Sequence, residues 1–183
     1  YEGTDGTNYS STTAPTDAGT YKVTYKVAGS NADYTGEKEY TFTISPKDVT
    51  ANMIGAIAAQ EYTGSAITPT PEVKDGNATL TAGTDFEFSY NKTTDVSENT
   101  ATVTITGKGN YTGTASKTFT IKPKDIKGAT ITLQENSLIY TGQMQEVTIA
   151  SVTLNGVTLS ADDYDIVKDS NKQISADDSI TLT

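Results

Sequence analysis

The sequence contains no Cys, His, Trp or Arg. Without Cys and His, it can form no disulfide framework, Cys nucleophile, Ser-His-Asp triad, or His or Cys zinc site. The absence of Arg also removes the bidentate guanidinium clamp on phosphate. These absences exclude most enzyme chemistry. We therefore expect a protein that is not an enzyme, with no catalytic residue, cofactor or metal.

Charge and hydropathy exclude two further classes of partner. Thirteen Lys stand against 23 acidic residues, for a net charge of -10. Nucleic acid and anionic lipid are disfavoured, because both require clustered basic side chains. No apolar run is long enough to cross a bilayer, and no charged-then-apolar leader begins at Tyr1. We expect no membrane insertion within this segment, and a signal peptide would have been removed or would lie outside it.

Thr is the dominant residue, with 35 of the 183 positions, and 11 further positions are Tyr. Both are strand formers, and Thr suits the outward face of a strand. Only 34% of the residues are hydrophobic, which favours several small cores over one large core. The composition predicts an all-β protein.

Internal repeats organise the chain. Residues 41–49 (TFTISPKDV) recur 77 positions later as residues 118–126 (TFTIKPKDI). Tyr34-Thr35-Gly36 recurs at the same offset as Tyr111-Thr112-Gly113. We call such short recurring motifs words. Two different words that recur at the same offset of 77 residues indicate an internal repeat.

A second set of words marks the start of each repeat. Residues 60–64 (QEYTG) match residues 138–142 (LIYTG), and residues 80–88 match residues 159–166 if one residue is deleted. In that match, Asp85 aligns with Asp163.

The words divide the chain into three units. Residues 46–122 form a complete repeat, whereas residues 1–45 contain only the later half of one. Residues 123–183 form a repeat truncated at its C-terminus, so we interpret the chain as a window on a longer array. Neighbouring repeats are then the first partners expected.

Strict alternation predicts the strands. In residues 100–106, Ala101, Val103 and Ile105 point to one side and four Thr point to the other. Pro46 and Pro123 end the last strands of their units, because proline cannot donate to a ladder. Turn chemistry is found in residues 74–77, 107–110 and 154–157, where Gly or Asn can adopt positive φ.

No segment has a convincing helical period, and the best, residues 51–60, is short and interrupted by Gly55. Short strands with frequent turns in a unit of this length predict tandem small antiparallel immunoglobulin-like β-sandwich domains. Another small all-β module, such as a helix-poor β-grasp relative, has the same periodicity and stays open.

The words in residues 80–90, 100–106 and 107–121 together resemble the tandem immunoglobulin-like repeats of bacterial cell-surface proteins, of the MBG or YDG type. Residues 13–21 are similar to a variant of the same family. The resemblance covers essentially the whole chain. It implies an extracellular, wall-attached array in a Gram-positive bacterium that serves as stalk, spacer or adhesin. It implies no catalytic residue and no general ligand site.

The repeated tyrosines of Tyr-Thr-Gly are the first candidate site, and they are Tyr34, Tyr62, Tyr111 and Tyr140. Exposed rings could stack on sugars. The structural alternative is a ring that caps the core, with the following Gly relieving the turn. We favour the structural reading, because the word recurs at equivalent places. Most of the other tyrosines should also lie in cores.

Two polar motifs are weaker candidates. Gly107-Lys108-Gly109 lacks the spacing and the helix of a phosphate loop. The densest acidic cluster comprises Asp162, Asp163, Asp165, Asp169, Asp177 and Asp178. These residues could offer oxygen ligands to Ca²⁺, but the EF-hand spacing is absent, so solubilising charge is the favoured reading. Paired carboxylates for glycoside hydrolysis would need a cleft, and none is expected.

Lys47 and Lys124 recur beside Asp48 and Asp125 at the junctions. An intramolecular isopeptide bond between Lys and Asn or Asp would require a buried Lys. Junctions between domains are usually exposed to solvent, so this bond is not the favoured interpretation. The recurrent Pro-Lys-Asp more simply sets the angle between units.

The sequence therefore favours a non-catalytic structural stalk or spacer, a stiff acidic rod at the bacterial cell surface. The alternative is an adhesion module that binds carbohydrate or a host matrix protein through loops at one end of a unit. Half repeats leave strand edges and half a core uncovered. We therefore expect the terminal halves to be completed by one another in a neighbouring molecule or to be partly disordered.

Overall fold

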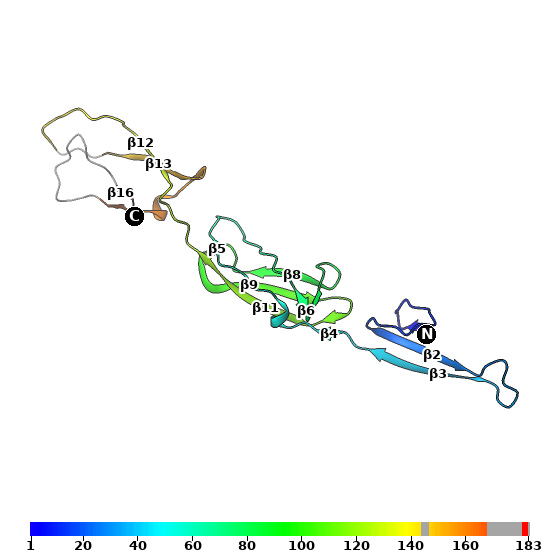
Figure 1. Ribbon diagram of the computed structural model, residues 1–183. Coiled ribbons are helices and arrows are strands. Elements are labelled where there is room, and N and C mark those ends of the chain that lie inside the picture. Colours follow the sequence, from blue (N-terminus) through cyan, green and yellow to red (C-terminus); the bar gives the residue numbers. More distant parts are fainter. Residues whose placement is uncertain (144–146, 168–180, 183) are drawn as a thin grey trace. The chain divides into compact units, whose positions relative to one another are not determined.

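The computed structural model describes residues 1–143, 147–167 and 181–182. This part of the protein is all-β and consists of several small sheets (Figure 1). The helical turns in it are two short 3-10 turns, η1 (Ala51–Met53) and η2 (Ala161–Asp163). The chain divides into two compact units, Tyr1–Lys124 and Asp125–Thr183.

The N-terminal part of the first unit is a three-stranded antiparallel sheet. Its strands are β1 (Glu2–Thr4), β2 (Gly19–Lys26) and β3 (Glu37–Ile44), in the order β1-β2-β3. Tyr21 is 1% exposed, and its ring stacks on Phe42 directly opposite on β3, with a centroid distance of 5.6 Å. Alternation therefore places the apolar residues on one face, as the sequence predicts.

The rest of the first unit is built on a four-stranded sheet in the order β5-β11-β9-β8 (Figure 1). The strands are β5 (Gln60–Glu61), β8 (Phe86–Asn91), β9 (Ser97–Gly107) and β11 (Thr114–Lys122). Ala101, Val103 and Ile105 are each 0% exposed, which confirms the alternation predicted for this strand. β3 ends before Pro46 and β11 ends before Pro123, also as predicted.

Residues 49–80 cover the apolar face of this sheet. They include η1 and the small hairpin of β6 (Lys74–Asp75) and β7 (Ala78–Thr79), which turns at Gly76 with φ 59°. One buried cluster joins the covering segment to the sheet, and it consists of Val49, Met53, Ile54, Val73, Leu80, Phe86, Val103 and Ile105. We call residues 49–80 the covering segment.

Two pairs of short strands in the first unit are parallel. β4 (Lys47–Asp48) pairs in parallel with β10 (Tyr111–Thr112), and β5 pairs in parallel with the end of β11. The chain that leaves Pro46 runs in the same direction as these later strands before it crosses the sheet face. The antiparallel pairing predicted from the sequence therefore does not extend to these two short strand pairs.

The register between β2 and β3 in the N-terminal sheet matches the register between β9 and β11 in the four-stranded sheet. Tyr21 lies opposite Phe42 as Ala101 lies opposite Phe119. Two positions further along, Val23 pairs with Tyr40 and Val103 pairs with Lys117. The hairpin of β2 and β3 thus repeats the hairpin of β9 and β11, at the alignment given by the sequence words.

The second unit contains β12 (Thr130–Leu133), β13 (Ile149–Leu154) and β14 (Val157–Thr158) in one antiparallel sheet, and β15 (Ile166–Val167) paired with β16 (Thr181–Leu182). The turn between β13 and β14 has φ 50° at Asn155 and φ 83° at Gly156. Positive φ at both positions is the geometry that Asn-Gly favours.

The second unit repeats contacts of the covering segment. Ile131 pairs with Val152 as Ile54 pairs with Val73. The Leu159 amide donates to the Val152 carbonyl at 2.9 Å, as the Leu80 amide donates to the Val73 carbonyl at 2.8 Å. The division into three repeats (1–45, 46–122 and 123–183) stays a prediction, but these matched bonds follow its alignment.

Candidate functional site

The four Tyr-Thr-Gly words share the conformation of their glycine. Gly36, Gly64, Gly113 and Gly142 all have positive φ, between 73° and 108°. Glycine is required here because other residues rarely adopt this region. The prediction that the glycine relieves a turn is confirmed.

The tyrosines of these words differ in burial. Tyr111 packs against the main core cluster, as the capping interpretation predicts. Tyr34 is 73% exposed and Tyr140 is 92% exposed, so the capping interpretation is wrong for these two, while Tyr62 lies between at 37%. The positive φ of the glycine is therefore the feature that all four Tyr-Thr-Gly words share. The tyrosine ring is packed against a core only in Tyr111, which lies against the cluster formed with the covering segment.

The link between the first two repeats is part of the four-stranded region's structure. The Lys47 amide donates to the Asn110 carbonyl at 2.9 Å, and the Val49 amide donates to the Thr112 carbonyl at 2.9 Å. These bonds fix the Pro-Lys-Asp segment as strand β4 beside β10. The link therefore has little freedom after Pro46.

Asn110 also contacts the N-terminal sheet region. Its Oδ1 accepts a 2.7 Å hydrogen bond from the Ala18 amide, and its Nδ2 donates a 2.9 Å hydrogen bond to Asp17 Oδ1. The Tyr21 hydroxyl donates to the Asp17 carbonyl at 2.7 Å. Asn110 thus bonds both the linker and the loop before β2. We call Asp17, Ala18, Lys47 and Asn110 the junction clasp.

Lys47 forms an exposed ion pair. Its Nζ lies 2.6 Å from Asp75 Oδ1, and the Lys47 side chain is 60% exposed. The Tyr111 hydroxyl donates to Asp75 Oδ2 at 3.4 Å. Burial and the nearby Asp75 charge raise the pKa of Tyr111 above its ordinary value of 10.0. The Lys47 side chain is exposed to solvent, as expected at a junction between repeats. It therefore differs from the buried lysine that an isopeptide bond requires.

The N-terminal sheet exposes two tyrosines on its apolar face. Tyr25 is 65% exposed and Tyr40 is 66% exposed, although both share the face of buried Tyr21. Tyr1 and Tyr9 pack edge-on against Phe42 and Tyr21, and so cover only that end of the face. The expectation that most remaining tyrosines lie in cores is wrong for Tyr25 and Tyr40. We call these two residues the open tyrosine face.

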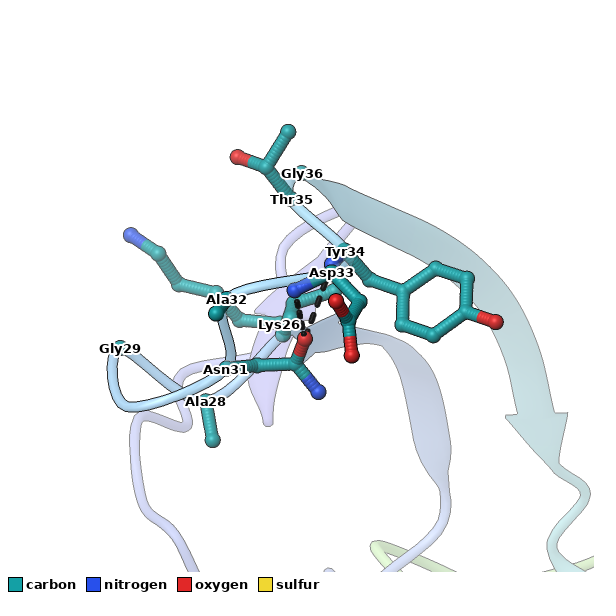
Figure 2. Close-up of a pocket in the computed structure, with 10 residues that line it drawn as sticks. Lys26, Ala28, Gly29, Asn31, Ala32, Asp33, Tyr34, Thr35 and Gly36 are labelled. Carbon is teal, nitrogen blue, oxygen red and sulfur yellow. Dashed lines mark hydrogen bonds between the residues drawn. The ribbon is translucent and has the colours of Figure 1, made fainter.

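The hairpin loop between β2 and β3 surrounds a shallow pocket of about 370 Å³, lined by residues 26–29 and 31–36. Figure 2 shows Asn31 inside the loop, where its Oδ1 accepts hydrogen bonds from the amides of Asp33 (2.9 Å) and Tyr34 (2.8 Å). The Tyr34 ring projects away from the loop (Figure 2). The loop is therefore ordered by its own polar contacts and presents one free aromatic face, which is a geometry that can stack on a sugar.

The acidic cluster of the second unit is only partly described. Asp162, Asp163 and Asp165 lie in the described part, while Asp169, Asp177 and Asp178 lie outside it. Asp163 Oδ2 accepts hydrogen bonds from the Ser160 amide and hydroxyl, both at 2.8 Å, and these bonds hold the pKa of Asp163 below its ordinary value.

Asp163 has a counterpart in the first unit, where Asp85 Oδ2 accepts from the Thr81 amide at 2.8 Å. The aspartate at this aligned position closes a loop in both units. Among the described residues, no group of three or more acidic side chains is placed to hold a metal ion.

Gly107-Lys108-Gly109 connects β9 to β10, so strands flank it on both sides. Lys108 Nζ pairs with Glu87 at 2.6 Å on the neighbouring strand. The loop serves as a hairpin turn, as the sequence indicates.

The sequence interpretation missed the junction clasp. Asn110 precedes the Tyr-Thr-Gly word and reads as a turn residue, and its partners lie 92 and 93 positions away. No local pattern reports a contact of that range. The only signal is that Asn110 stands directly before a repeated word.

Comparison with known families identifies one segment. A family model described as the MBG domain matches residues 2–48, and the rest of the chain is unassigned. The resemblance given by the repeat words is thus confirmed for this segment. The MBG domain is a non-catalytic repeat domain, typical of repeats in bacterial surface proteins. No curated protein and no solved structure matches the chain.

No helix in the described part of the chain has both the length and the apolar character needed to cross a membrane.

Proposed function

We propose that the chain is a non-catalytic stalk or spacer segment of a bacterial cell-surface protein. Its repeats would be small immunoglobulin-like sandwiches outside the cell, attached to the cell wall or surface. They would hold a more distal module away from the surface. The MBG match over residues 2–48 and the all-β composition support this class of function.

The observation that carries the proposal is the junction clasp. A spacer can hold a distal module at a fixed distance from the surface only if the links between its repeats are ordered. Here the link is strand β4, and Asn110 bonds both this strand, through the Lys47 amide, and the loop before β2, through Asp17 and Ala18. Each exposed hydrogen bond contributes only about 0.5–1.5 kcal/mol. Together with a linker of few residues, they restrict bending without an extensive buried interface.

The polar faces of the sheets suit such a role. On the N-terminal sheet, Lys22 Nζ lies 3.2 Å from Glu2 and 2.9 Å from Glu39 on the two neighbouring strands. On the four-stranded sheet, the positions of β9 that alternate with its buried residues are Thr100, Thr102, Thr104 and Thr106. An acidic surface rich in Thr favours solubility and resists non-specific contact.

Residual dipolar couplings test the spacer proposal on the full chain. If the junction is ordered, one alignment tensor will fit the amide couplings of residues 19–44 and residues 86–122 together. Two tensors of clearly different magnitude would show independent motion of the two sheets, and the stalk proposal would then lose its basis.

A second candidate function is adhesion to a glycan or a host matrix protein. The observation that favours it is the exposure of Tyr34 on an ordered loop beside a pocket. An array of glycans and matrix proteins provides the test, with Tyr34→Ala as the probe variant and Val157→Ala, at a position that is 63% exposed, as the control. Binding that is lost only in Tyr34→Ala would support adhesion, whereas no binding by the folded chain would exclude this loop as an adhesion site.

A further inference from the structure

The turn between β13 and β14 contains the one Asn-Gly pair of the sequence, Asn155-Gly156. Both residues are exposed, and both have positive φ, 50° at Asn155 and 83° at Gly156. The pairing of Leu154 with Val157 closes the turn on its two sides. The pair therefore forms a tight loop at the surface of the second unit.

The side chain of Asn155 is not held by the structure around it. Its carboxamide makes no hydrogen bond to any described residue. By contrast, the carboxamide oxygens of Asn31, Asn99 and Asn110 each accept a hydrogen bond. Those bonds fix the carboxamide carbon, whereas the carboxamide of Asn155 can rotate towards the main chain.

The backbone nitrogen of Gly156 is equally accessible. Its N–H donates to no acceptor in the described part of the chain, and a Cβ built on Gly156 would meet nothing within 4 Å. The missing side chain matters, because a Cβ on the following residue crowds the approach of its nitrogen to the preceding carboxamide. Asn77 lies in the exposed turn between β6 and β7, but it is followed by Ala78, which carries such a Cβ.

We propose that Asn155 is a site of spontaneous deamidation. The Gly156 nitrogen attacks Asn155 Cγ, and the new N–Cγ bond closes a succinimide ring. The Cγ–Nδ2 bond breaks, and ammonia leaves with the proton of the Gly156 amide. Water then adds to one of the two ring carbonyls and opens the ring, which leaves aspartate or isoaspartate at position 155. Water is the only co-reactant, no electron is transferred, and the inference does not depend on the stalk function.

The short strand β14 lets the ring form in the folded chain. The attack requires rotation about the main-chain bonds of Asn155, so the turn must open. β14 has only two residues, and Val157 in it is 63% exposed. Segments with few buried contacts open locally at little cost, so we expect Asn155 to convert in the folded chain within about tenfold of its rate in the unfolded chain.

Isoaspartate would change the turn more than aspartate. It places an additional methylene in the main chain, so the tight loop can no longer align Leu154 with Val157. β13 also carries the buried Val152, whose carbonyl accepts the Leu159 amide at 2.9 Å. The second unit should therefore loosen around this bond as the molecule ages, while the first unit stays unchanged.

Peptide mass spectrometry of the full chain, kept folded in warm, mildly alkaline buffer, tests the proposal. Conversion adds one mass unit, and at Asn155 it should be about tenfold faster than at Asn77, which corresponds to about 1.4 kcal/mol of activation free energy. Gly156→Asn is the matched variant, because asparagine tolerates positive φ but carries a Cβ. It should slow conversion of Asn155 towards the rate at Asn77, and circular dichroism checks that it folds.

The same chain in urea gives the reference rate. The proposal is overturned if Asn155 converts in urea but more than about a hundredfold more slowly in the folded chain, because the turn would then protect it. It is also overturned if Gly156→Asn converts at residue 155 as fast as the unmodified chain, because the Gly156 nitrogen would then not be the attacking group.

Hydrogen exchange tests the structural consequence. The Leu159 amide should exchange faster in the isoaspartate-containing fraction of the aged chain than in the fresh chain. The Leu80 amide, which makes the aligned bond to the Val73 carbonyl at 2.8 Å, is the internal control and should not change. Asn155→Asp adds the charge without the methylene, so it should leave the Leu159 rate close to that of the fresh chain. Equal acceleration in Asn155→Asp would overturn the main-chain argument in favour of a charge effect.

Discussion

Asn110 Nδ2 donates a 2.9 Å hydrogen bond to Asp17 Oδ1, across 93 positions of sequence. The same Asn110 accepts from the Lys47 amide through its backbone carbonyl. One residue thus ties the loop before β2, the linker and the turn before β10 to one another. This relationship makes the link between two repeats an ordered element of the fold.

Replacing Asn110 should loosen the link without unfolding either sheet. In Asn110→Ala, the Ala18 amide loses its acceptor at 2.7 Å, at a cost of about 1 kcal/mol. Hydrogen exchange at Ala18 should therefore accelerate by up to about tenfold. Asn91→Ala, at an exposed strand position, is the control and should leave the Ala18 rate unchanged. Equal rates in both variants would contradict the clasp.

The open and covered faces should respond very differently to matched truncations. Ile105→Ala removes a fully buried side chain and should lower the free energy of unfolding by about 2–5 kcal/mol. Tyr25→Ala, at the aligned position, should change it by no more than about 0.5 kcal/mol, because the ring is 65% exposed. Urea unfolding of dilute protein measures both. A large loss in Tyr25→Ala would mean that another surface already covers the ring.

The glycine of Tyr-Thr-Gly should be irreplaceable for a backbone reason. Gly113 has φ 76°, and a Cβ there would lie 3.3 Å from Asp48 Oδ1. Gly113→Ala should therefore cost about 1–2 kcal/mol. Gly29→Ala is the control in the same unit, since a Cβ there meets nothing within 4 Å, and it should be close to neutral. Thermal or urea unfolding that ranks the two variants equally would refute the argument.

Alkaline pH should destabilise the first unit. Burial raises the pKa of Tyr21, Tyr90 and Tyr111 above the ordinary value of 10.0, with nearby carboxylates adding to the effect at Tyr21 and Tyr111. A raised folded-state pKa favours the neutral phenol, so this contribution is complete below pH 10 and is lost as pH rises through the folded-state pKa values.

Phenolate absorbance and urea unfolding between pH 9 and pH 12 measure this effect. Phenolate formation at Tyr21, Tyr90 and Tyr111 should be displaced to higher pH than the ordinary pKa of 10.0. A free energy of unfolding that stays constant over this pH range would contradict the expected coupling between tyrosine ionisation and unfolding.

Local and repeated features were predictable from the sequence. Alternation located β9, Pro123 located the end of β11, and the words aligned Leu80 with Leu159, whose amides make the same hydrogen bond. These features depend on neighbouring residues or on self-similarity, and a single sequence contains both.

Long-range contacts were not predictable. The parallel pairing of Lys47 with Tyr111 and the bond from Asn110 to Asp17 join residues that no periodicity relates. The exposure of Tyr25 and Tyr40 was missed for a related reason. Alternation places a side chain on the apolar face of a strand, but whether that face is covered depends on a distant segment.

The central claim is that the first two repeats are joined by an ordered link, and the distance between two spin labels tests it most directly. The chain has no Cys, so Thr41→Cys and Ser89→Cys, at exposed positions on β3 and β8, provide the sole attachment sites. Double electron–electron resonance on labelled protein diluted with unlabelled protein should give one narrow distance distribution, which broadens in Asn110→Ala. A broad distribution in the unmodified chain, unchanged by Asn110→Ala, would contradict the account.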